Sequence, residues 1–240
     1  MGQRLLQDLL GRPHLAWVHW TPPCGAFSRA REIRRPGAPP PLRNHTYIRG
    51  FPALQWKHKA RVHSANLLTD FMAACCRQLS ARGICWSIEN PTNSLLWHYP
   101  SVRTLITDKP ETQFHACMWG SRRRKATSIV SNRSWFHGLA RFCDGQHTHL
   151  GWGKVAQAGT AVWSTALESA YPKALATQWA QCAASSRRRA ASSAAACKRR
   201  RLRSRAASVR ASARSRGDWY ASARMAAVSQ GSRACKTVAG

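Results

Sequence analysis

Acidic residues are scarce in this chain of 240 residues. Only 9 Asp and Glu stand against 38 Lys and Arg, which gives a formal net charge of +29. A charge of this size and sign disfavours cationic partners and predicts an anionic one, most simply nucleic acid. DNA is the partner that we expect.

Long apolar runs are also lacking, since no stretch of the sequence approaches the ~20 residues of a membrane-spanning helix. The chain shows no signal peptide with an apolar centre, and its 9 cysteines lack the regular spacing of a secreted disulfide framework. We therefore expect reduced thiols, no membrane partner, and a nuclear or cytoplasmic protein that is not secreted.

Large apolar residues are rare in residues 183–240, which hold 15 Lys and Arg against the single Asp218, a net charge of 15 − 1 = +14. This Ala/Ser/Arg-rich composition predicts a disordered basic tail that binds phosphates without reading sequence. Its Lys198–Arg203 run also fits a nuclear-localisation patch. The alternative is a translated GC-rich region with no selected role. We predict two parts, a folded domain at 1–182 and the tail at 183–240.

The pattern of residues 1–182 predicts an α/β fold. Helical spacing over 64–79 ends at Gly83, and the apolar strand 84–88 follows at once, which is typical of a parallel crossover. The other predicted elements are a short helix at 1–11, strands at 15–20, 114–118 and 128–130, a long loop over 36–58 and a helix from Pro172 to about Ala183.

Cys24 follows the first of these strands at a rigid turn. Pro22 and Pro23 fix φ and cannot donate to a sheet ladder, so the strand must stop there and the thiol is held in place. Nearby arginines favour a thiolate, which is the nucleophilic form. The alternative is a small cysteine that packs at the end of a strand.

A carboxylate ends a second strand, in the segment Ile88-Glu89-Asn90-Pro91. Alone, this segment is equally consistent with a turn and a solvated Glu. Together with Cys24 it is more specific, because a nucleophile and an acid at the tips of two strands can converge on one substrate.

These two motifs, Thr21-Pro22-Pro23-Cys24-Gly25-Ala26-Phe27-Ser28 and Ile88-Glu89-Asn90-Pro91, resemble those of DNA cytosine-5 methyltransferases, in particular their divergent phage-like relatives. The resemblance implies a partial Rossmann-like, S-adenosylmethionine-dependent fold. It implies that Cys24 attacks C6 of a flipped cytosine and that Glu89 binds N3 and the exocyclic amine. Methyl transfer from S-adenosylmethionine to C5 would follow, with Thr21, Pro22 and Asn90 near the cofactor.

A basic segment, Met118 to Ser131, resembles the family's later basic motif. On an extended chain, residues two apart point the same way, so Arg123 and Lys125 are assigned to the catalytic site, although the opposite phase or a solvated loop is also consistent with the sequence. Residues 167–175 resemble a late segment of the divergent relatives.

The family's glycine-rich cofactor loop does not occur upstream of Cys24 in this sequence, where only a short amphipathic helix is predicted. We therefore expect weak binding of S-adenosylmethionine or none, and a partner or upstream segment that supplies the cofactor half. The alternative function is a non-catalytic, nucleic-acid-binding remnant of such an enzyme. A chain that forms no stable fold is a third interpretation.

A group of cysteines and histidines offers soft and imidazole ligands: Cys143, His147 and His149, with His115 and Cys117 upstream. Four of these five residues would suit tetrahedral zinc, but the Cys-x3-His-x-His spacing is not a common finger spacing. Capped loop histidines explain the pattern as well, and we assign no metal ligand from the sequence.

Overall fold

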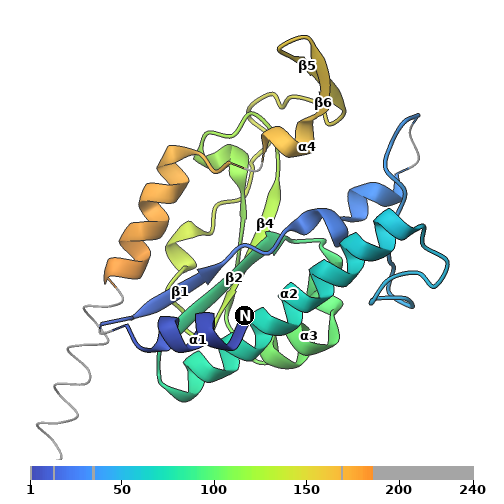
Figure 1. Cartoon of the computed structure of the whole chain (residues 1–240). Coiled ribbons are helices and arrows are strands. Elements are labelled where there is room, and N and C mark those ends of the chain that lie inside the picture. The colour runs from blue at the N-terminus through green and yellow to red at the C-terminus, as the bar shows by residue number, and fades with distance from the viewer. Residues whose placement is uncertain (1, 13, 34–35, 169, 186–240) are drawn as a thin grey trace, which may run out of the picture. The chain divides into compact units, whose positions relative to one another are not determined.

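The computed structural model describes residues 2–12, 14–33, 36–168 and 170–185 (Figure 1). Strands and helices are mixed in these residues, which confirms the predicted α/β class. The basic tail, with its proposed phosphate-binding and nuclear-localisation roles, lies outside the described residues beyond residue 185.

Four strands form the main sheet, in the order β1-β2-β4-β3. β1 and β2 run parallel, with Trp17 opposite Cys85 and Trp20 opposite Ile88. β4 runs antiparallel to both of its neighbours. The bounds are Trp17–Trp20 for β1, Cys85–Pro91 for β2, Glu111–His115 for β3 and Ala126–Ser131 for β4.

The parallel pair β1 and β2 is joined by α2, Trp56–Ala81, as the helix-then-strand pattern predicts. α2 begins eight residues before the predicted helix, so the end of the predicted loop 36–58 is helical. Gly83 ends the helix with φ of 71°. The Gly83 N–H donates to Ser80 O at 3.0 Å and the Ile84 N–H donates to Leu79 O at 2.9 Å, a Schellman motif that directs the chain into β2.

Helices cover both faces of the sheet (Figure 1). On one face, Trp86 and Ile88 of β2 pack in a core with α2 and α3, which spans Pro100–Ile106. On the other face, Phe114 and Ile129 pack with Leu175 and Trp179 of the helix 173–185. Because side chains alternate along a strand, Ser87 and Glu89 point to the same side as this last helix.

The remaining elements are short. They comprise α1 at Gly2–Leu10, a hairpin of β5 (Lys154–Gln157) and β6 (Thr160–Trp163), α4 at Ser164–Leu167, and single 3-10 turns at Cys24–Ala26, Arg29–Glu32, Leu95–His98, Ala116–Trp119 and His137–Leu139. None of the described helices is both long enough and apolar enough to cross a membrane.

Three predicted boundaries differ from the observed elements. The predicted strand 114–118 ends at His115, and Ala116–Trp119 form a 3-10 turn that Gly120 closes with φ of 98°. The predicted strand 84–88 continues to Pro91, because Glu89, Asn90 and Pro91 still pair with β4. The structure places the last described helix at 173–185, so the predicted domain boundary after residue 182 falls inside it.

Candidate active site

Cys24 lies directly after β1, at the start of a 3-10 turn. The Pro22-Pro23 pair ends the ladder with β2, and the Phe27 N–H then closes the turn by donating to Cys24 O at 2.9 Å. The Asn90 side-chain amide donates to Pro22 O at 3.1 Å, which ties this turn to the end of β2. The thiol is therefore fixed relative to the Glu-Asn segment and exposed to solvent.

Glu89 lies on the neighbouring parallel strand and is only 5% exposed. Its carboxyl group hydrogen-bonds to the Tyr171 side chain, while its Oε1 atom has no partner among the described residues. Burial raises the pKa of Glu89, and the nearby Lys125 ammonium and the Tyr171 contact act in the opposite direction. Oε1 is thus a buried polar atom that a bound ligand can satisfy.

Cys24 and Glu89 line the same cavity, of about 600 Å³. The prediction that the two motifs meet is confirmed, whereas their chemical roles stay predictions. Aromatic side chains from β1 and from the C-terminal segment form much of the wall. The lining residues are Trp17, His19, Thr21, Pro22, Pro23, Cys24, Glu89, Pro91, Lys125, Ala170, Tyr171, Ala176, Trp179 and Ala180.

Lys125 lines this cavity and Arg123 does not. The Arg123 guanidinium is buried elsewhere, 3.1 Å from Glu168 Oε1 and 3.0 Å from the Gly151 carbonyl oxygen that it donates to. The assumption of an extended chain fails here, because the Lys125 N–H donates to Arg123 O at 3.0 Å and folds the segment just before β4 begins. Arg123 therefore holds the Gly151 loop, and of these two residues only Lys125 brings its positive charge to the cavity.

Of the three residues predicted near the cofactor, two line the cavity and one lies behind its wall. Thr21 and Pro22, expected near the cofactor, are part of the wall. Asn90 is buried behind it, where its amide donates to Pro22 O and to Glu89 O. Its role in the structure is to position the two motifs rather than to line the cavity.

His19 is a residue of the cavity wall that we did not single out from the sequence. Ser87 Oγ accepts from Trp17 Nε1 at 2.9 Å and lies within hydrogen-bond distance of His19 Nδ1, at 2.8 Å. Burial lowers the pKa of His19 to about 4, which keeps the ring neutral. The alternation in β1 could have identified His19, because Trp17 and His19 are two residues apart and lie on one face of the strand. Trp179 packs there, with its ring centre 4.3 Å from that of His19.

The Cys24 thiol has a raised pKa despite its exposure. Desolvation by the surrounding groups is the largest cause, the Glu89 carboxylate adds to it, and the Lys125 and Arg61 charges oppose it. At neutral pH the thiol is protonated in the free protein, and a positive charge or a proton acceptor is needed to generate the nucleophile.

We expect Lys125→Met to slow alkylation of Cys24 by iodoacetamide, because the change removes the main charge that favours the thiolate. The loss should be on the order of three- to tenfold at pH 7.5, with the rate profile displaced to higher pH. Peptide mapping by mass spectrometry measures the rate at Cys24 alone. Arg124→Met, which removes an exposed charge one residue away, is the matched control. Equal rates in the two variants would show that Lys125 does not influence the thiol.

Comparison with known proteins identifies no relative: neither a family model nor a curated protein nor a solved structure matches the chain. The site must therefore be interpreted from its own geometry and from the resemblance of its motifs.

Proposed function

We propose that this chain carries the nucleophile and the acid of a DNA cytosine-5 methyltransferase site, with Cys24 as nucleophile, Glu89 as acid and Lys125 as the charge that supports both. The observation that carries the proposal is the convergence of the Cys24 thiol and the Glu89 carboxyl on one cavity from the ends of two adjacent parallel strands. Ligands of open α/β sheets bind at this end of the strands.

The proposed chemistry needs an electron-pair donor and a proton donor on opposite sides of one ring. The Cys24 thiolate forms a bond to C6 of cytosine, the C5–C6 π electrons move through the ring toward N3, and N3 takes a proton from Glu89. C5 is then electron-rich and accepts an electrophile. Water takes the proton from C5, the C5–C6 double bond re-forms as the sulfur–C6 bond breaks, and N3 returns its proton to Glu89, which restores the aromatic ring, the thiolate and the acid.

The raised pKa of Glu89 supports the acid role, because a carboxyl group must keep its proton near neutral pH in order to deliver it. Its unpartnered Oε1 is available to a base edge. Trp17, Tyr171 and Trp179 supply apolar faces on which an unstacked base can pack. The net charge of +29 supports a DNA backbone as the partner.

The described residues do not fit the methyl donor as well as they fit the base. S-adenosylmethionine is held in such folds by a glycine-rich turn, and the described cavity wall contains no glycine. The side-chain nitrogen of Asn90, a residue expected near the donor, is committed to Pro22 O and Glu89 O, while its Oδ1 has no partner among the described residues. The steps above therefore use the chain's own residues and the base, and a donor-binding half from another segment or partner is part of the proposal.

Exchange of the hydrogen at C5 of cytosine tests this proposal without a methyl donor. If Cys24 adds to C6, water can supply the proton that C5 accepts, and reversal releases the original hydrogen. DNA carrying tritium at C5 should then lose tritium to water in proportion to the chain added. DNA that retains all of its tritium under conditions where it binds the chain would contradict the proposal.

A non-catalytic nucleic-acid-binding protein is the second candidate, favoured by the protonated state of Cys24 in the free chain and by the charge of the tail. This candidate predicts binding to DNA with no exchange at C5. The two functions share the expectation that the tail contributes to binding, which we test separately.

Deletion of residues 187–240 should weaken binding to any DNA sequence and flatten its salt dependence. The deletion removes 15 Lys and Arg and one Asp, a net charge of +14. For every phosphate that the shortened chain no longer neutralises, the slope of log K against log salt should become shallower by about 0.9. A full-length variant with Lys198–Arg201 replaced by four Gln residues is the control for chain length. Identical slopes for the intact and truncated chains would mean that the tail does not bind phosphates.

A further inference from the structure

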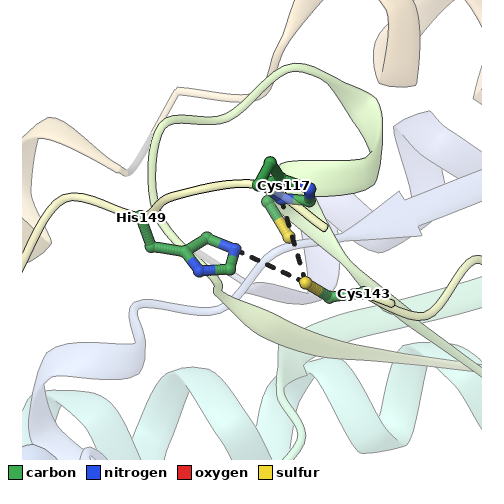
Figure 2. Close-up of side chains that lie close together, drawn as sticks. Cys117, Cys143 and His149 are labelled. Atoms are coloured by element: carbon green, nitrogen blue, oxygen red, sulfur yellow. Dashed lines mark hydrogen bonds between the residues drawn. The ribbon is translucent and has the colours of Figure 1, made fainter. Parts of the chain in front are cut away.

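A second group of reactive side chains lies apart from the cavity. Cys117 comes from the 3-10 turn after β3, and Cys143, His147 and His149 come from the irregular segment between Ala140 and Gly151. One ligand atom from each residue lies within 4.8 Å of every other. Figure 2 shows the Cys117 and His149 side chains converging on the Cys143 sulfur.

Two of the distances between these ligand atoms match a tetrahedral metal site. Zinc bonds of about 2.3 Å to sulfur and 2.0–2.1 Å to nitrogen place the ligand atoms of a tetrahedron about 3.3–3.8 Å apart. Cys143 Sγ lies 3.5 Å from His149 Nε2 and 3.8 Å from His147 Nε2. Each imidazole thus turns its Nε2 atom toward the Cys143 sulfur.

The surrounding contacts select these four residues out of the five candidates in the sequence. His115 is committed elsewhere, because its Nδ1 accepts from the Cys143 N–H at 2.9 Å. His147 has Asp144 Oδ1 3.8 Å from its Nδ1, on the side opposite the sulfur. The Gly145 N–H donates to Cys143 Sγ at 3.4 Å. Carboxylates behind ligating histidines and N–H groups on ligating sulfurs are the usual outer contacts of metal sites.

We propose that Cys117, Cys143, His147 and His149 bind one zinc ion in a closed, structural site. Two thiolates and two neutral imidazoles complete the tetrahedron, so no position is left for water or substrate. The ion joins the end of β3 to a segment that has no regular secondary structure over 140–151. That segment in turn contacts the basic motif, through Leu150 N–H to Arg122 O at 2.9 Å and Arg123 Nε to Gly151 O at 3.0 Å.

Metal content tests the proposal directly on the full-length chain. Purified under reducing conditions from cells supplied with zinc, the wild-type chain should carry one zinc ion by elemental analysis, and Cys143→Ser should carry none. Cys24→Ser, a cysteine outside the cluster, and His63→Gln, an exposed histidine of α2, should retain the metal in full.

Two further measurements keep the test decisive if Cys143→Ser fails to fold. Cobalt added to the metal-free wild-type chain should give thiolate charge-transfer bands and intense tetrahedral d–d bands. His149→Cys, which keeps a ligand at that position, should retain zinc, while His149→Ala should lose most of it. A reduced, folded wild-type chain that takes up neither zinc nor cobalt would overturn the proposal, as would equal zinc in Cys143→Ser and Cys24→Ser.

Discussion

Cys24→Ser should abolish tritium release from C5 of cytosine, with a loss of about 10³-fold or more. A serine hydroxyl must lose its proton to a base before it can attack C6. It therefore adds to C6 far more slowly than a thiolate does. Because Cys24 is exposed and its side chain packs against little of the core, the variant should unfold at the same temperature as the wild type.

The matched control for this prediction is Cys197→Ser, a cysteine outside the described residues. It should exchange at the wild-type rate. If Cys24→Ser keeps more than a tenth of the exchange activity while Cys197→Ser behaves as wild type, Cys24 is not the nucleophile.

Glu89→Gln should lower the exchange rate by about 10²- to 10⁴-fold, because an amide can hydrogen-bond to the base but cannot deliver a proton to N3. Gln has nearly the same shape as Glu, so the cavity wall is preserved. DNA affinity should change little, since most of it comes from phosphate contacts. A rate within threefold of the wild type would exclude Glu89 as the acid.

The same variant should remove a pH dependence of stability. A carboxyl whose pKa is raised on folding contributes most to stability at pH values below the pKa that it has in the unfolded chain, near 4.5. That contribution is lost as the pH rises through the pKa of the folded chain. Relative to Glu89→Gln, the wild type should therefore lose about 1.4 kcal/mol of unfolding free energy for each unit by which the pKa is raised. Urea unfolding of both proteins at pH 5 and pH 8 measures the difference, and parallel changes in the two would contradict it.

The end of the first strand and the parallel crossover were the parts of the fold that local sequence patterns could predict. Two prolines before Cys24 stop a ladder whatever the rest of the chain does, and helical spacing followed by Gly83 and an apolar strand predicts a parallel crossover. The meeting of Cys24 and Glu89 follows from that crossover, because adjacent parallel strands end at the same edge of the sheet.

Tertiary contacts decided the features that the sequence could not predict. Arg123 and Lys125 differ in exposure and direction because Glu168, more than forty residues later, pairs with the Arg123 guanidinium. The hydrogen bond between Tyr171 and Glu89 depends on how the C-terminal segment returns across the sheet. The resemblance of residues 167–175 marked that segment without assigning any residue in it a role.

The Cys–His cluster illustrates the same limit. The spacing of Cys143, His147 and His149 does not by itself distinguish metal ligands from loop histidines. The position of Cys117 supports the proposed metal site, and it depends on the 3-10 turn that replaces the end of the predicted strand 114–118.

A covalent adduct between the chain and a modified DNA tests the central claim most directly. An oligonucleotide in which pyrimidin-2-one replaces cytosine lacks the electron-donating amino group at C4, so its C6 is more open to attack by a thiolate. Intact mass spectrometry of the wild-type chain should show the added mass of one oligonucleotide, and peptide mapping should place it on Cys24. A chain that binds this DNA but forms no adduct, or forms it on another cysteine, would contradict the account.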